Sequence, residues 1–295
     1  MSAPTTTSTL TGVSLRPGEP RDAEACGRIF WEAFASIASQ HSFPIEPGVP
    51  EFTNWKATQM LSDPGFVATV AESKGEIIGS VFVDVRAPIL GVGPVTVDPA
   101  FQDGGVGRCL MEHVLSDAKA RGSAGVRLVQ TAYHYRSLSL YAKLGFQVRE
   151  PLSVMQGEIQ DDSPLASEVR PASPSDIDAC NELCILVHGH ERNGELRDAI
   201  SEGSAVVAER GGRSTGYATG VGYGWHAVGE TNEDLISILR SAKNIIGLGV
   251  LVPSRNHGLL GWCLDHGLRL VQQSTLMTTG LYNEPQGSYL PSIVF

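Results

Sequence analysis

The most constraining segment of this sequence is a glycine loop, within residues 95–108, that joins an apolar strand pattern to a helical pattern. Backbone N–H groups at a helix N-terminus favour an anion, because they have no helical partner and the helix dipole is positive at this end. Glycines let the backbone approach a phosphate closely. The segment therefore predicts a binding site for a phosphorylated ligand.

Two common phosphate loops do not fit the spacing. A dinucleotide-binding loop requires Gly-x-Gly-x-x-Gly, but Gly105 and Gly107 are followed by Leu110 at the third position. A Walker loop ends in Gly-Lys-Ser/Thr, whereas Gly107 precedes Arg108 and Cys109. The phosphorylated ligand is therefore of another kind.

The spacing matches the pyrophosphate loop Arg/Gln-x-x-Gly-x-Gly/Ala, with Gln102, Gly105 and Gly107 at its fixed positions. In these residues the chain resembles the GNAT-type (GCN5-related) N-acetyltransferases. The resemblance implies that acetyl-CoA is the acyl-donor substrate and that no metal takes part. It also implies which backbone binds the cofactor: the strand residues Val95, Thr96 and Val97 for the pantetheine arm and the oxyanion, and the loop residues Gln102, Asp103, Gly104, Gly105, Val106, Gly107 and Arg108 for the pyrophosphate.

The periodicity after the loop predicts a helix over residues 106–121. Its apolar residues recur every three or four positions and form one stripe, as in Leu110, Val114 and Ala118. Gly122 is placed to cap the C-terminus of this helix. Residues 126–131 then predict a strand.

A second family signature lies in residues 136–146, which resemble the cofactor-side helix that ends in Tyr-x-x-x-Gly-Phe. Tyr141, Gly145 and Phe146 occupy its positions. The resemblance implies that Tyr141 protonates the departing CoA thiolate, which a phenol with a pKa near 10 can do within hydrogen-bond reach. The alternative is that the Tyr141 ring only packs in the core.

The sequence departs from this signature at two positions. The family usually has Asn and Ala where this chain has His134 and Ser137. His134 could still bond the pantetheine arm, or it could be an exposed loop residue. We keep His134 as a candidate cofactor-binding residue.

The second half of the chain predicts a repeat of the first. A short strand that contains Arg16 leads into a helix, and a strand that contains Arg170 does the same after a shift of 154. Gly145 corresponds to Gly267 by a shift of 122. Carried back along the chain, that shift puts Ala227 at the position of Gly105 and Cys263 at that of Tyr141. We therefore expect an α/β (α+β) fold of two tandem GNAT-like acyl-CoA acyltransferase units, each a mixed twisted sheet flanked by helices, and a degenerate second unit.

Composition sets the predicted limits of these units. Residues 1–11 predict a disordered tail, 12–159 the catalytic GNAT domain, 160–167 a linker, and 168–295 the degenerate domain with a C-terminal tail. The N-terminus lacks the basic and apolar regions of a secretory signal, and no apolar run is long enough to span a membrane. Five cysteines without disulfide or zinc spacing indicate a reduced, cytoplasmic protein.

The net charge of −10 excludes a basic nucleic-acid-binding face and suits an amine substrate. We expect a small-molecule or peptide amine as acceptor and no membrane partner; a homodimer stays open. The sequence does not single out a general base. Glu72, Asp84 and His41 are candidates, and water is the alternative. Three functions stay open: an N-acetyltransferase that acts on a primary amine by direct attack, a non-catalytic acyl-CoA-binding sensor, and a tandem synthase that acylates a thiol-cofactor precursor.

Overall fold

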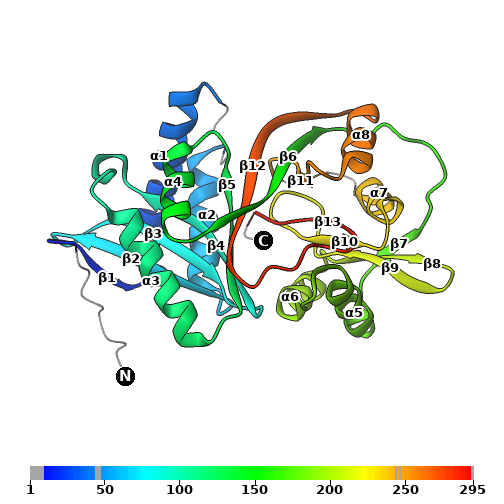
Figure 1. Cartoon of the computed structure of the whole chain (residues 1–295), viewed down its shortest axis with the longest axis horizontal. Helices are drawn as coiled ribbons and strands as arrows, with labels where there is room; N and C mark the ends of the chain where they lie inside the picture. Colours follow the sequence, from blue (N-terminus) through cyan, green and yellow to red (C-terminus); the bar gives the residue numbers. More distant parts are fainter. Residues whose placement is uncertain (1–9, 44–47, 243–244, 246, 294–295) are drawn as a thin grey trace. The chain divides into compact units, whose positions relative to one another are not determined.

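The computed structural model describes residues 10–43, 48–242, 245 and 247–293. The chain groups into two compact units (Figure 1), the first comprising residues 1–85, 89–126 and 133–146, and the second residues 86–88, 127–132 and 147–295. Residues 147–157, which the sequence analysis assigns to the first domain, group with the second compact unit. The boundaries of the sequence repeat stay a prediction. Of the predicted disordered tail, residues 1–9 lie outside the described residues.

The first unit contains an antiparallel sheet in which β1 pairs with β2, β2 with β3, and β3 with β4. Its strands are β1 (Ser14–Pro17), β2 (Phe66–Ser73), β3 (Glu76–Asp84) and β4 (Ile89–Val97). Buried side chains cluster between the sheet and its first two helices, among them Cys26, Met60, Val70 and Phe82.

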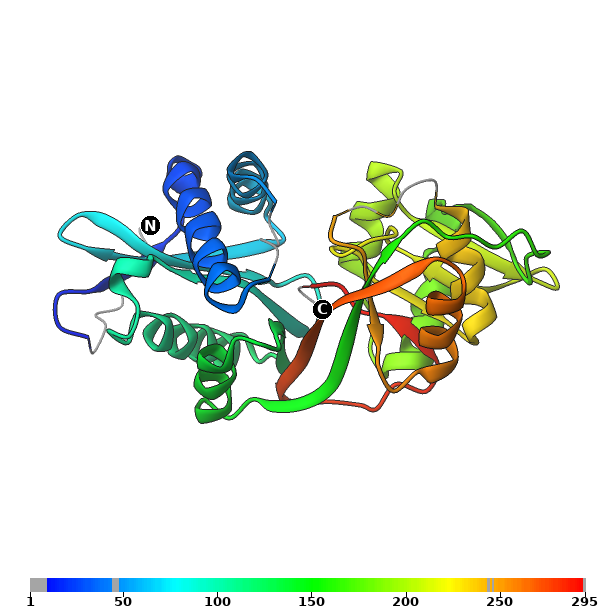
Figure 2. The same cartoon turned by 90° about the horizontal axis from the view of Figure 1, so that it is seen from above.

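Helices cover both faces of this sheet, α1 and α2 on one side and α3 and α4 on the other (Figure 2). They are α1 (Ala23–His41), α2 (Pro50–Ser62), α3 (Val106–Arg121) and α4 (Tyr135–Lys143), with short 3-10 turns η1 (Pro20–Asp22) and η2 (Pro99–Phe101). The bounds predicted for α3 are confirmed. Gly122 ends α3 with φ 70° and donates its N–H to the Ala118 and Lys119 carbonyls, as predicted for a cap.

The second unit contains a five-stranded antiparallel sheet in the order β13-β10-β9-β8-β7. Helices α5 and α6 lie on one side of it and α7 on the other (Figure 1). The strands are β7 (Glu168–Pro171), β8 (Val206–Arg210), β9 (Arg213–Ala218), β10 (Ala227–Gly229) and β13 (Ser288–Leu290). The helical elements are η3 (Pro174–Asp176), α5 (Ile177–His188), α6 (Asn193–Glu202), α7 (Asn232–Ser241) and α8 (His257–Asp265).

A second set of strands in this unit joins the two halves of the sequence. Hydrogen-bonded neighbours run in the order β5 (Gly125–Thr131), β12 (Leu268–Gly280), β6 (Gln147–Gly157) and β11 (Val250–Pro253). Both β12 and β11 pair with β6 in antiparallel fashion. Strand β6 follows α4 and Gly145, whereas β12 follows α8 and Gly267, and these glycines have φ 90° and 92°. The last strand of each repeat therefore pairs with the last strand of the other.

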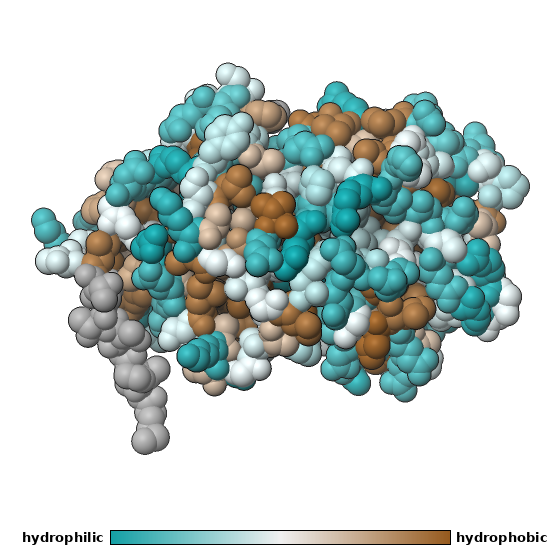
Figure 3. Space-filling model, in the orientation of Figure 1, coloured by the Kyte–Doolittle hydropathy of each residue, from teal (hydrophilic) through white to brown (hydrophobic). Residues whose placement is uncertain are grey.

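Hydrophilic side chains cover much of the face seen in Figure 3, and apolar ones gather over α8 and the start of β12. Leu264 and Leu270 are 51% and 43% exposed there. All five cysteines are buried and none forms a disulfide. Among the described residues, no helix has the length and the hydrophobicity that crossing a bilayer requires.

Candidate active site

The glycine loop starts where β4 ends at Val97. Asp98 then begins the turn η2, and its Oδ1 accepts a hydrogen bond from the Ala100 N–H at 2.9 Å. Gln102 Nε2 donates to the Val97 carbonyl at 3.1 Å. The Gln102 side chain therefore braces the two ends of the turn, and a ligand would meet the backbone of the loop.

Two loop residues have a left-handed backbone, Asp103 with φ 65° and Gly105 with φ 89°. Glycine takes this conformation without a steric cost, which explains Gly105 directly before α3. The exposed Asp103 carboxylate accepts a hydrogen bond from Arg136 Nη2 at 2.6 Å. Arg136 belongs to α4, so this ion pair ties the cofactor-side helix to the loop. The predicted site did not include Arg136, although it lies only two residues after His134.

The N-terminus of α3 has the properties of an anion site. Its first internal hydrogen bond runs from the Cys109 N–H to the Gly105 carbonyl at 3.0 Å. The N–H groups of Val106, Gly107 and Arg108 come before that bond, and Gly105 has no side chain to cap them. The first turn of α3 contains no acidic residue, so none of its side chains opposes the helix dipole. A phosphate group fits this end of the helix.

Gly107 lies between the preceding strand and α4. A Cβ atom there would be 3.6 Å from Leu140 Cδ2 and 3.7 Å from Val97 Cγ2, which is ordinary contact. Alanine would therefore also fit, in agreement with the Gly/Ala position of the motif. The Arg108 guanidinium is half-exposed and forms an ion pair with Glu112 at 3.2 Å.

At the end of β4, a ligand would meet the backbone rather than the polar side chain of Thr96. Thr96 is 1% exposed, and its Oγ1 lies 3.1 Å from Ser80 Oγ. Val95 and Val97, on either side, are half-buried. The β3–β4 register shifts at residues 93–94, so a bulge directly precedes these three residues.

Tyr141 lies on α4, 7% exposed, with its ring centroid 5.9 Å from that of Phe146. Burial raises the pKa of Tyr141 above the ordinary value of a phenol. The hydroxyl therefore keeps its proton at neutral pH, as a proton donor must. The ring packs in the core as well, so both predicted roles agree with this geometry.

His134 is the N-cap residue of α4, and its carbonyl accepts a hydrogen bond from Ser137 Oγ at 2.9 Å. Burial and, to a smaller degree, the charges of Arg136 and His41 lower the pKa of His134 to about 4. The ring is therefore neutral at physiological pH. A neutral imidazole has one N–H donor and one acceptor for a ligand.

The three candidate bases lie in different surroundings. Glu72 on β2 accepts a hydrogen bond from Arg16 Nε at 2.9 Å, which is a structural role. Asp84 pairs across the sheet with Gly91, at the end of β4 remote from the glycine loop. His41 ends α1, is exposed, and lies 5.3 Å from the ring of Tyr133. Of the three, His41 alone lies beside the start of α4.

An aromatic group that the sequence analysis did not identify lies within the first unit, between the end of α1 and the residues just before α4. Phe43 stacks on Tyr133 with centroids 4.1 Å apart and ring planes 9° from parallel. His41 contacts the same ring, and His134 follows Tyr133 in the chain. The signal in the sequence is an aromatic residue within two positions of each histidine, Phe43 after His41 and Tyr133 before His134.

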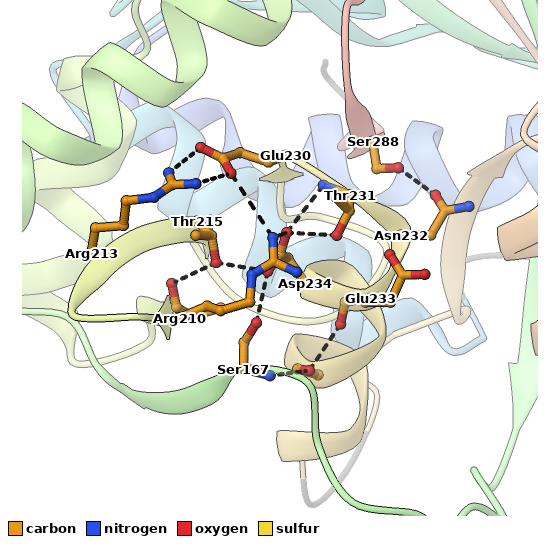
Figure 4. A network of polar contacts seen from close by, with 12 residues as sticks. Ser167, Arg210, Arg213, Thr215, Glu230, Thr231, Asn232, Glu233, Asp234 and Ser288 are labelled. Carbon is orange, nitrogen blue, oxygen red and sulfur yellow. Dashed lines mark hydrogen bonds and ion pairs between the residues drawn. The ribbon is translucent and has the colours of Figure 1, made fainter.

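The corresponding helix of the second unit, α7, has a different N-terminus (Figure 4). Thr231 and Asp234 form a reciprocal capping box, in which Asp234 Oδ2 accepts hydrogen bonds from the Thr231 N–H and Oγ. Asp234 is fully buried, and Ser167 and Thr215 donate hydrogen bonds to its other oxygen at 2.7 and 2.6 Å. Glu230 adds a further carboxylate. This helix N-terminus is capped and acidic, so it does not fit a pyrophosphate.

One alignment in the predicted repeat is wrong. The constant shift placed Ala227 at the position of Gly105, but Ala227 is the first residue of β10. Only Glu230 and Thr231 separate β10 from α7. The long glycine loop therefore has no counterpart of its own in the second unit. Asn256 is the N-cap of α8, and its side-chain oxygen accepts a hydrogen bond from the Leu259 N–H.

Comparisons with known proteins match the segment that contains these residues. Residues 64–148, which include β4, the loop, α3 and Tyr141, match the model of the acetyltransferase (GNAT) domain. The chain is 33% identical over 150 residues to mycothiol acetyltransferase of Amycolatopsis mediterranei, covering 47% of this chain and 48% of that protein. It is 30% identical over 95 residues to IAA acetyltransferase of Azospirillum brasilense, covering 32% and 62%. The matches thus span less than two thirds of either relative.

The fold as a whole also has a counterpart. A crystal structure of a proposed acetyltransferase from Pyrococcus horikoshii superimposes with a TM-score of 0.72, at 18% identity, over 94% of each chain. At this identity the likeness concerns the fold alone. The family-model match places residues 64–148 in the GNAT (GCN5-related N-acetyltransferase) superfamily.

Proposed function

We propose that this protein is an N-acetyltransferase that transfers an acetyl group from acetyl-CoA to a primary amine by direct attack, and that the first unit is catalytic. One contrast carries the proposal. The N-terminus of α3 has a glycine N-cap and no acidic residue in its first turn, whereas that of α7 is closed by Asp234. Only the first of these two ends suits a pyrophosphate.

The residues of the first unit have separate roles in this proposal. Residues 102–108 hold the pyrophosphate through backbone N–H groups, and the backbone of residues 95–97 lines the pantetheine arm and the acyl carbonyl. The amine forms a C–N bond at the thioester carbonyl as the C–S bond breaks. Tyr141 holds the proton that the leaving sulfur takes up.

The acceptor side is proposed at the aromatic group of Phe43, Tyr133 and His41. These residues lie at the end of α1 and next to His134, close to the cofactor-side helix. His41 or water takes the proton of the attacking amine. Because one relative is named for mycothiol, amine-bearing precursors of thiol cofactors belong in the acceptor panel.

The first test is calorimetric titration with acetyl-CoA, on the wild type and on Gly105→Glu, which adds a carboxylate to the phosphate loop. The matched control is Gly122→Glu, which introduces the same side chain at φ 70° at the other end of the same helix. We expect binding to the wild type and the control, with loss only in Gly105→Glu. No binding to the folded wild type would overturn the assignment of the loop.

The second candidate is an acyl-CoA-binding module without turnover, favoured by His134 in place of the family's Asn. CoA release with a panel of primary amines separates the two. Amine-dependent release that Gly105→Glu abolishes supports the enzyme. Binding of acetyl-CoA without release by any amine supports the binding module.

A further inference from the structure

A polar cleft of about 460 Å³ lies in the second unit, where β10 and β11 end and α7 and α8 begin. Glu230 and Asn232 line it from the start of α7, Arg255 and Asn256 from the start of α8, and Ser288 from β13. Figure 4 shows Glu230, Asn232 and Ser288 around the beginning of α7. By chain order this is the second unit's counterpart of the place where the first unit would hold its cofactor.

The chain itself closes this place to a CoA molecule. Strand β13 pairs with β10, with Tyr289 opposite Val228 and Ser288 opposite Gly229. The strand edge that would carry a pantetheine arm is therefore already hydrogen-bonded to protein. Asp234 caps α7, as described above, so a pyrophosphate has no helix end to bind. The cleft that remains is a different kind of site.

Carboxylates outnumber cations among the residues that line the cleft. Its lining includes the carboxylates of Glu150, Glu230 and Glu284 and the single guanidinium of Arg255. Arg255 donates to Glu150 Oε2 from Nε at 2.9 Å and from Nη2 at 2.6 Å, and it reaches Glu284 at 3.1 Å. Glu230 is held by Arg213, which is not among the lining residues. The lining therefore has more negative than positive charge.

Two buried polar atoms of the lining lack a hydrogen-bond partner. Glu150 is 2% exposed, and although its Oε2 meets Arg255, its Oε1 has no partner among the described residues. Tyr289 is 5% exposed, and its hydroxyl likewise has none. An unsatisfied buried carboxylate oxygen is costly, so a site of this kind favours an N–H donor that completes it.

From this arrangement we propose that the cleft binds a small organic cation with a primary ammonium group. The ammonium donates hydrogen bonds to Glu150 Oε1 and to the Tyr289 hydroxyl, and Glu284 attracts it at the mouth. The Arg255 side chain is 57% exposed, so it can turn aside to admit the ligand, and the ammonium then replaces its hydrogen bonds to Glu150. The volume suits a molecule of diamine or amino-acid size. This site is independent of acetyl transfer by the first unit.

The test is titration of the full chain with putrescine and with Nα-acetyl-lysine methylamide, by calorimetry and by thermal melting. The first probe represents a free amine and the second a lysine side chain. Inorganic phosphate serves as the anionic probe. Amines are also proposed as acceptors in the first unit. Variants of the cleft residues therefore show whether the measured amine binding occurs in the cleft or in the first unit.

Glu150→Gln removes the charge while keeping the size of the side chain, and should weaken cation binding about tenfold, or about 1.4 kcal/mol. Tyr289→Phe removes a hydroxyl without a partner, so it should fold normally and also weaken binding. Arg255→Gln removes the competing guanidinium and should strengthen cation binding. The control Glu182→Gln makes the same charge change on the exposed face of α5 and should have no effect.

Three outcomes would overturn the proposal. Equal weakening by Glu150→Gln and Glu182→Gln would indicate general charge attraction only. Phosphate binding that Arg255→Gln abolishes would assign the cleft to an anion. No heat and no rise in melting temperature with either amine at about 10 mM would exclude a cation site of even millimolar affinity. If Glu150→Gln fails to fold, Tyr289→Phe decides the question alone.

Discussion

Arg170 Nη2 lies 2.7 Å from Asp176 Oδ1, and the same pair recurs in the first unit, where Arg16 Nη2 lies 2.9 Å from Asp22 Oδ1. In each copy the arginine lies in the first strand and the aspartate directly precedes the first long helix. The aspartate also accepts a hydrogen bond from a backbone N–H. Each arginine also binds a glutamate of the neighbouring strand. The repeat in the sequence is thus also a repeat of one ion-pair network.

The network predicts a loss of stability in acid. Hydrogen bonds from Arg170 lower the pKa of Asp176 below its unfolded value, as those from Arg16 do for Asp22. The stabilisation is therefore complete above about pH 4 and is lost as the pH falls through the folded pKa. We expect Asp176→Asn to lower the free energy of unfolding by about 1–3 kcal/mol at pH 7 and to flatten its decline below pH 4. Urea unfolding across pH measures both effects.

The control for this variant is Asp178→Asn, two residues further on at an exposed position of α5. It removes the same charge without touching Arg170. Equal losses of stability in the two variants would refute a specific role for the Arg170–Asp176 pair.

Tyr141→Phe tests the proposed proton donor. Because burial raises the pKa of Tyr141, the wild-type phenol stays protonated throughout the neutral range. We expect the variant to bind acetyl-CoA normally and to lose about a hundredfold or more in turnover. Tyr135→Phe, at a 69% exposed position of the same helix, is the control. Unchanged turnover in Tyr141→Phe would leave this residue a packing role only.

Local features of the first unit could be predicted because neighbouring residues determine them. A stripe of apolar residues fixed α3, and Gly105 and Gly122 adopt the positive φ values that the turn and the cap require. Tyr141 falls on the predicted helix. The role of the Gln102 side chain did not follow from the motif, because its contact with Val97 depends on how the loop folds back.

Long-range pairing could not be predicted in the same way. Strand β6 pairs with β12, more than a hundred residues away, since the repeats exchange their last strands. Tyr289 lies in a segment that the sequence suggests is only a tail, yet β13 pairs with β10. Ala227 was misplaced because the repeats differ in loop length exactly where a constant shift was assumed. Periodicity describes one element at a time and carries no information on which strands meet.

Asp234→Asn tests the closed N-terminus of α7. The buried carboxylate accepts hydrogen bonds from Ser167, Thr215 and Thr231. An amide nitrogen in place of one oxygen leaves some of these donors without an acceptor, so we expect a loss of about 2 kcal/mol or more in the free energy of unfolding. Acetyl-CoA affinity should not change. The control is Glu233→Gln, at an exposed position in the same turn. A change in acetyl-CoA affinity in Asp234→Asn alone would show that the second unit takes part in cofactor binding.

Buried histidines of the second unit predict a further loss of stability in acid, at a higher pH than the loss expected from the aspartates. Burial, with the charge of Arg127 as a smaller cause, lowers the pKa of His190 to about 4, and burial also lowers the pKa of His188 and His226. The unfolded chain therefore binds more protons than the folded chain between about pH 6.5 and pH 4, and stability falls as the pH falls through this range. We expect His190→Gln to have a shallower fall than the wild type, as measured by urea unfolding at pH 7, 6 and 5. His257→Gln, at an exposed position, should follow the wild type. Because this range lies above that of the aspartates, parallel wild-type and His190→Gln profiles between pH 7 and pH 5 would show that His190 is not buried in its neutral form.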